Sequence, residues 1–154
     1  MALSFNDKHV TSLLTPELAP NERVLFRARG VEKPWYSRVF SRFGSMFWRS
    51  YLVAATDQRL LFVQHGGLLS GFKAKAVHAL RWQEIDRTQL GWGIFNKNLT
   101  VRSQARSFTK TVVLGRFWMK GNFPAAEGVV STWNQSKGAL LGAPQPAALP
   151  AQRA

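Results

Sequence analysis

The chain has 154 residues, a length that predicts one domain large enough to bury a stable core. It contains no cysteine, which excludes disulfides, thiolate metal sites and a cysteine nucleophile. Lysine and arginine total 21 against 8 acidic residues, so the formal net charge is +13. An excess of this size indicates attraction to a polyanion, namely nucleic acid, an acidic membrane or an acidic protein, without choosing among them.

The N-terminal residues show no basic segment followed by an apolar core, so no signal peptide is predicted. No apolar run approaches the roughly 18 residues that a membrane-spanning helix needs. We therefore expect a soluble, cytoplasmic chain, attached peripherally to the inner face of the membrane if its ligand is a lipid.

The first predicted elements are a short helix and a strand. Residues 7–14 predict a helix capped by Asn6 or Asp7 and ended by Pro16 and Pro20. Residues 23–30 alternate between apolar and polar side chains, the period-2 pattern of a half-exposed strand.

The clearest element in the sequence is a β-hairpin over residues 51–64. Two apolar runs, 51–55 and 60–63, flank Thr56-Asp57-Gln58, and they are rich in β-branched and aromatic residues. Asp57 can hydrogen-bond its own backbone and close a tight turn. The runs are nearly continuous rather than alternating, so we expect this hairpin at the centre of a sheet.

Four further strands and a closing helix are predicted downstream. The strands are 74–82, 85–92, 99–102 and 108–114, separated by polar turns that include Asn96-Lys97-Asn98. Pro124 suits a first helical turn. The residues Ala126, Val129, Val130 and Trp133 then fall on one helical face, and Gly138 is the predicted stop.

The predicted organisation is therefore an N-terminal helical segment (1–14), a β domain (15–138) and a disordered tail (139–154) rich in alanine and proline. Seven antiparallel strands must close on themselves or be covered, because open edges invite aggregation. We expect a mainly β fold: a strongly bent sheet with the last helix plugging one end.

Three short segments match, in order, the pattern of one family. Leu18-Ala19-Pro20-Asn21-Glu22-Arg23-Val24 resembles its L-x-P-x-E-x-V segment, Ala55-Thr56-Asp57-Gln58-Arg59-Leu60-Leu61 its T-D-x-R-L-L hairpin, and Trp82-Gln83-Glu84-Ile85-Asp86 its x-x-E-I segment. Over about residues 15–137 the chain resembles the bacterial pleckstrin-homology-like domains, a group related to GRAM domains. The resemblance implies a PH-like split barrel of two nearly orthogonal sheets capped by a C-terminal helix. It implies no catalysis, and it allows a homo-oligomer.

The charge pattern predicts a ligand-binding end of the sheet. Because alternate turns of an antiparallel sheet lie at opposite ends, the connections 31–49 and 65–76 share one end, and Thr56–Gln58 and Gln83–Glu84 share the other. In the resembled fold the turn between the sixth and seventh strands joins the first end. The predicted ligand-binding residues are Lys33, Arg38, Arg42, Arg49, Lys73, Lys75 and Arg106, with Lys110 nearby and Glu32 as the one acid. The alternative is that these charged loops are only solvated.

Residues 35–48 are the richest aromatic segment. Tyr36, Phe40, Phe43 and Phe47 recur at helical spacing, while Arg38 and Arg42 lie on another side. Such a basic amphipathic helix can lie in a membrane interface. The predicted membrane or partner contacts are Trp35, Tyr36, Phe40, Phe43, Phe47 and Trp48. The alternative is that these rings pack over the open end of the barrel or against a neighbouring subunit.

No pattern in the sequence predicts a cofactor, a metal site or an enzyme. His9, His65 and His78 have no metal-ligand spacing, and no phosphate-binding glycine motif is present. The first hypothesis is a non-catalytic module that binds anionic lipid headgroups or an acidic surface. The second is a protein–protein interaction or homo-oligomeric scaffold module. The third is non-specific nucleic-acid binding through cations and stacking rings, for which no motif is present.

Overall fold

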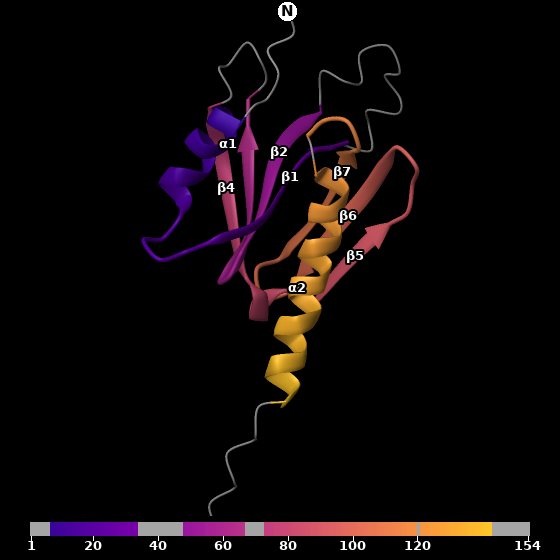
Figure 1. Ribbon diagram of the computed structural model, residues 1–154. Helices are drawn as coiled ribbons and strands as arrows, with labels where there is room; N and C mark the ends of the chain where they lie inside the picture. The colour runs from indigo at the N-terminus through magenta and orange to yellow at the C-terminus, as the bar shows by residue number, and fades with distance from the viewer. Residues whose placement is uncertain (1–6, 34–47, 67–72, 120, 143–154) are drawn as a thin grey trace, which may run out of the picture.

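The computed structural model describes residues 7–33, 48–66, 73–119 and 121–142 (Figure 1). The chain folds as a helix, seven strands and a closing helix, as predicted. In chain order the elements are α1 (Asp7–Leu14), the 3₁₀ helix η1 (Thr15–Glu17), β1 (Val24–Glu32), β2 (Arg49–Thr56), β3 (Arg59–His65), β4 (Ala74–Arg81), the 3₁₀ helix η5 (Trp82–Glu84), β5 (Arg87–Gly91), β6 (Asn96–Ser103), β7 (Phe108–Gly115) and α2 (Asn122–Gly142).

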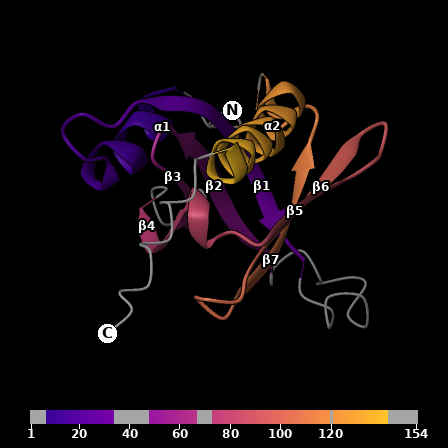
Figure 2. The same cartoon turned by 90° about the horizontal axis from the view of Figure 1, so that it is seen from below.

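The seven strands form one antiparallel sheet in the order β4-β3-β2-β1-β7-β6-β5. A single register pair, Val31 with Val113, joins β1 to β7, so the sheet divides there into two halves. Gly30 permits the crossing, because a Cβ at this position would lie only 2.6 Å from Leu114 Cδ2 and 2.7 Å from the Val113 carbonyl oxygen. The result is the bent, PH-like sheet that was expected, with α2 over the junction of its halves (Figure 2).

The central hairpin is buried on both faces. On the inner face Tyr51, Val53 and Phe62 belong to the main core with residues of β5–β7 and α2. On the outer face alternate residues of β2 and β3, such as Leu52 and Leu61, pack against α1 in a second core. Covering both faces explains why the hairpin sequence is nearly continuously apolar rather than alternating. Each fully buried leucine or valine stabilises the fold by about 1.5–3 kcal/mol.

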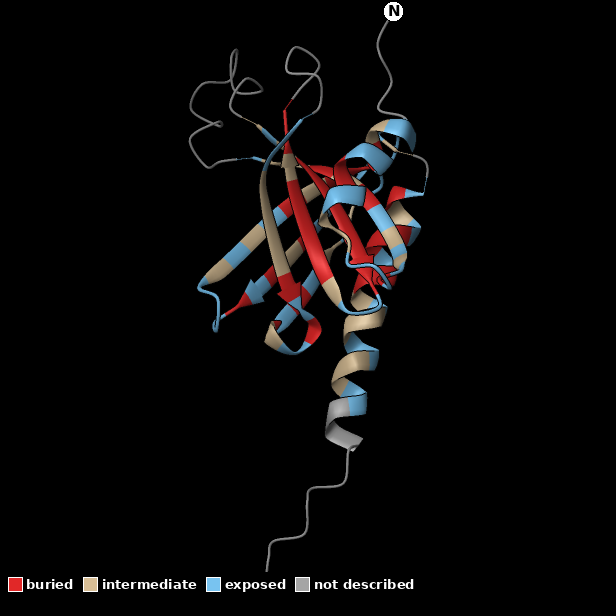
Figure 3. Ribbon diagram, turned by 90° about the vertical axis from the view of Figure 1, so that its left-hand side faces the viewer, coloured by how far each residue is buried: buried red, intermediate tan, exposed pale blue. Residues whose placement is uncertain are grey.

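Helix α2 closes the main core with the face predicted from its spacing. Ala126 and Val129 are fully buried, Val130 and Trp133 are partly buried, and the indole nitrogen of Trp133 donates to the Ile85 carbonyl oxygen at 3.0 Å. The predicted stop at Gly138 is wrong, since the helix continues to Gly142. An exposed glycine within a helix costs only about 1 kcal/mol, which does not end it. The last turns project beyond the sheet (Figure 3).

The three segments that carry the family resemblance meet at one buried ion pair. The Glu22 carboxylate accepts hydrogen bonds from Arg59 Nε and Nη2, both at 2.8 Å, and from Thr56 Oγ1 at 2.7 Å. The Trp82 indole donates to the Thr56 carbonyl oxygen at 3.0 Å. The hydrogen bond from Arg59 is the main cause that lowers the pKa of Glu22 to about 2. These motif residues therefore hold the β2–β3 turn in place.

Candidate functional site

The end of β1 and the starts of β2 and β4 bring several basic residues to one end of the sheet. Glu32 and Arg49 are partners in the β1–β2 register, and the Gly66 amide donates to the Lys73 carbonyl oxygen at 3.0 Å. The connections on either side of the β2–β3 hairpin therefore share one end, as predicted. We call the exposed residues Lys33, Arg49, Lys73 and Lys75 the basic end.

The described residues do not neutralise the charges of the basic end. Among the residues that the structure describes, none of these four side chains forms an ion pair. The Lys33 ammonium lies 4.5 Å from the centre of the Trp48 ring, a cation–π contact that orients the side chain and leaves its charge in place. Four cations are thus available to an anionic ligand.

Glu32, an acid at this end, is partly buried and has partners within the sheet. Its carboxylate accepts hydrogen bonds from Lys110 Nζ of β7 and from the Tyr51 hydroxyl, both at 3.1 Å. Lys110 Nζ also donates to the Tyr51 hydroxyl at 2.8 Å, and its side chain is only 12% exposed. Because Lys110 compensates Glu32 internally, the carboxylate does not offset the exposed cations.

This internal cluster continues into the interior of the barrel. The His78 ring centre lies 5.4 Å from that of Phe108, which in turn lies 5.4 Å from Phe62. Burial, and secondarily Lys110, lowers the pKa of His78 below its ordinary value. The sequence interpretation missed this cluster. Strand alternation could have found it, because Glu32, Tyr51 and Lys110 all fall on inward-facing positions.

Arg106 does not belong to the basic end. Its guanidinium pairs with the Glu84 carboxylate at 2.9 Å, and Ser103 Oγ donates to the Glu84 carbonyl oxygen at 2.6 Å. The prediction that Arg106 lies beside Lys33 and Lys73 is therefore wrong. The bend between β1 and β7 carries the β6–β7 turn across to η5, which no local sequence pattern reveals.

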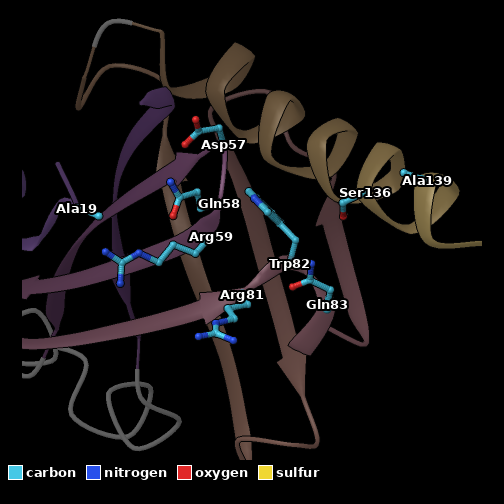
Figure 4. Close-up of a pocket in the computed structure, with 9 residues that line it drawn as sticks. All are labelled: Ala19, Asp57, Gln58, Arg59, Arg81, Trp82, Gln83, Ser136 and Ala139. Carbon is cyan, nitrogen blue, oxygen red and sulfur yellow. The ribbon is translucent and has the colours of Figure 1, made fainter. Parts of the chain in front are cut away.

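The opposite end of the sheet holds Asp57, Glu84 and Asp86 as predicted, together with arginines such as Arg81 and Arg87. A groove of about 770 Å³ lies there between the β2–β3 turn, η5 and α2, with Trp82 at its centre (Figure 4). Its central charges already have partners, because Arg59 binds Glu22 and Asp57 accepts a hydrogen bond from the Arg23 amide. We therefore do not assign a ligand to this groove.

Most of the predicted aromatic contacts lie outside the described residues. These are Trp35, Tyr36, Phe40, Phe43 and Phe47, together with the cations Arg38 and Arg42. Within the described ranges, no group of three histidine or acidic residues could hold a metal ion. No helix in the same ranges is long and apolar enough to cross a bilayer.

The sequence pattern of the family described as "Bacterial PH domain" matches residues 18–115. The chain belongs to the bacterial PH domain family. No curated protein shows a significant sequence match to it. The family assignment confirms the expected relationship, and it agrees with the bent seven-stranded sheet and the closing helix.

Solved structures similar to this bacterial PH domain match it at low sequence identity. The C-terminal domain of an unknown protein from Leishmania infantum has a TM-score of 0.52 at 16% identity, covering 84% of this chain and 99% of that chain. A protein with a pleckstrin-homology domain from Shewanella loihica has a TM-score of 0.48 at 13% identity, with coverages of 84% and 92%. A pleckstrin homology domain from Shewanella amazonensis has a TM-score of 0.47 at 15% identity, with coverages of 82% and 96%. PH domains generally bind lipids or proteins, and the family assignment alone does not name the ligand.

Proposed function

We propose that this bacterial PH domain is a non-catalytic module that binds anionic lipid headgroups through the basic end. The observation that carries the proposal is that four exposed cations gather at one end of the sheet, and that none of them forms an ion pair with a described residue. Glu32, the acid beside them, is paired with Lys110 instead. Arg38 and Arg42 belong to the connection between β1 and β2 and stay in the proposal on sequence grounds. Cytoplasmic location and peripheral attachment to the membrane are parts of the same proposal.

The expected affinity of the basic end is low. A basic residue near an anionic bilayer contributes about 1 kcal/mol, so four contribute about 4 kcal/mol. That free energy corresponds to a dissociation constant of about 1 mM. Useful attachment of one copy therefore needs a second contact, or several copies bound together.

Co-sedimentation with phosphatidylcholine vesicles, with and without phosphatidylserine, tests the proposal. We expect binding only to the phosphatidylserine vesicles, and at least a roughly tenfold loss of affinity in the Lys33→Glu/Lys73→Glu variant. The matched control is Arg23→Glu/Arg87→Glu, which changes the net charge equally at exposed positions away from the basic end. Arg87 lies opposite Arg102 in the sheet, so a glutamate there creates a favourable cross-strand pair.

Two results would contradict the proposal. One is an equal loss of affinity in both double variants, which would mean that only the net charge matters. The other is no binding to phosphatidylserine vesicles at low salt. Binding to a protein partner or to DNA that survives in the Lys33→Glu/Lys73→Glu variant would favour the alternative functions.

A further inference from the structure

Five large apolar side chains are exposed on two neighbouring connections. The β5–β6 turn carries Trp92 (88% exposed), Ile94 and Phe95 (both 65%), and the β7–α2 connection carries Phe117 (81%) and Trp118 (36%). We call these five residues the aromatic patch. In the described part of the chain, the only other exposed large hydrophobic residue is Leu25. Monomeric proteins rarely expose such a contiguous apolar group unless it is an interaction site.

Hydrogen bonds hold the two connections together. The Arg116 amide donates to the Phe95 carbonyl oxygen at 2.9 Å, and Asn96 is the register partner of Gly115. The Trp118 ring packs back over Gly115, where an added Cβ would lie 2.6 Å from its Cε2 atom. These contacts fix the position of the aromatic patch in the fold. The rings of the patch are therefore exposed in the folded sheet.

The charge around the aromatic patch favours an anionic partner. No acidic residue occurs between Asp86 and Glu127, whereas this stretch contains seven basic ones: Arg87, Lys97, Arg102, Arg106, Lys110, Arg116 and Lys120. Arg116 is exposed directly before Phe117. Glu127, the next acid along the chain, is paired with Lys97. Arg106 and Lys110 pair with Glu84 and Glu32, and Arg87 and Arg102 lie at the far ends of β5 and β6. Among the described residues, Arg116 is therefore the exposed cation that borders the rings, and a partner at this surface meets apolar rings beside a positive charge.

Those features match the surface of an anionic bilayer. Tryptophan is enriched at the headgroup level of membranes, because its ring is amphipathic, and phenylalanine suits the adjacent acyl boundary. The most exposed rings, Trp92 and Phe117, stand in connections between elements, where they can enter a soft interface without a complementary pocket. In Figure 1 both connections lie in the same half of the molecule as the end of β1, away from the C-terminal end of α2.

We infer that the aromatic patch inserts into the interfacial region of an anionic lipid bilayer, as a second membrane contact distinct from the basic end. The inference rests on the proposed function for the identity of the partner, an anionic bilayer, but the residues that make the contact are different. It supplies the second contact that four cations alone require, because burial of apolar rings adds to the electrostatic attraction.

Tryptophan fluorescence with phosphatidylserine-containing vesicles tests the inference, using lipids brominated in their acyl chains as quenchers. In the unmodified chain we expect quenching on vesicle binding. The Phe95→Ala/Phe117→Ala variant keeps Trp92 and Trp118 as reporters, and we expect it to lose at least about tenfold in vesicle affinity and most of the quenching. Leu25→Ala removes an exposed apolar side chain elsewhere and should change neither quantity. The truncated rings are exposed, so thermal unfolding should be nearly unchanged.

The outcomes separate this inference from the proposed function. If Phe95→Ala/Phe117→Ala binds and is quenched like the unmodified chain, while Lys33→Glu/Lys73→Glu loses binding, the inference is overturned and the basic end stands. If only the aromatic variant loses binding, the aromatic patch stands and the basic end fails. If light scattering shows a dimer that the aromatic variant converts to monomer, the patch is a self-association surface, and the inference is overturned.

Discussion

The buried Glu22–Arg59 pair makes the stability of this domain dependent on the charge of a single carboxylate. The Glu22 side chain is fully buried, and it accepts hydrogen bonds from Arg59, Thr56 and the Ala19 amide. Replacing Glu22 by glutamine keeps the shape of the side chain but removes its charge. The amide would then leave the Arg59 guanidinium without its anionic partner.

The magnitude follows from the pKa of Glu22, which is lowered from 4.5 to about 2. A difference of 2.5 units, at about 1.4 kcal/mol each, corresponds to about 3–4 kcal/mol of folding free energy. Since the pKa is depressed in the folded state, this contribution is fully present above pH 4.5. It is lost as the pH falls towards 2 and the carboxylate is protonated. At pH 7 we therefore expect Glu22→Gln to be less stable by about 3–4 kcal/mol.

Urea unfolding of both proteins between pH 7 and pH 2.5 measures this difference directly. The gap between the unmodified chain and Glu22→Gln should close as the pH falls below 4.5. The matched control is Glu17→Gln, because Glu17 hydrogen-bonds Arg59 through its backbone carbonyl and its carboxylate adds only the weakest of the charge interactions on Arg59. Its cost should stay below about 1 kcal/mol. A gap under about 1 kcal/mol at pH 7, or one that stays constant down to pH 3, would refute the assignment of stability to this carboxylate.

Three further variants probe the barrel and its closing helix. Lys110→Met leaves the Glu32 carboxylate without its cation, and we expect a loss of about 1–3 kcal/mol in urea unfolding at pH 7, with less loss in Lys110→Met/Glu32→Gln. Gly30→Ala places a Cβ 2.7 Å from the Val113 carbonyl oxygen, and it should cost about 1–3 kcal/mol by forcing β1 and β7 apart. In Gly138→Ala the added Cβ on α2 has no atom within 4 Å. We expect a higher thermal midpoint and a free energy of unfolding that is larger by about 0.5–1 kcal/mol. A lower midpoint would show that this glycine has a packing role.

The elements of the fold were predictable because they depend on local patterns. The apolar hairpin, the N-terminal helix and the apolar face of α2 all appear where the sequence pattern places them. The turn predicted at 96–98 is instead the start of β6. The polar Lys97 there is buried and pairs with Glu127, so a polar residue occupies an inward position. A helix partner that neutralises a strand lysine cannot be read from the strand alone.

The candidate site was predictable only in part, for a reason of geometry. Lys33, Arg49 and Lys73 meet because strand direction in the first four strands follows from chain order. Arg106 was misplaced because its position depends on the bend at Gly30, where two halves of the sheet meet through one residue pair. The exposed rings of the aromatic patch were missed for a related reason: local composition does not distinguish a buried tryptophan from one held at a surface.

The cluster of Glu32, Tyr51 and Lys110 occupies the inside of the barrel directly beneath the basic end. A ligand that docks on Lys33 and Lys73 therefore cannot send a phosphate down between the strands, where it would meet a filled and internally neutral wall. Under the proposed function, the contact with Lys33 and Lys73 would therefore depend on how densely negative charge is packed on a surface, and not on which positions of a sugar ring carry it. If the proposed function holds, such a domain would respond to the overall composition of a membrane.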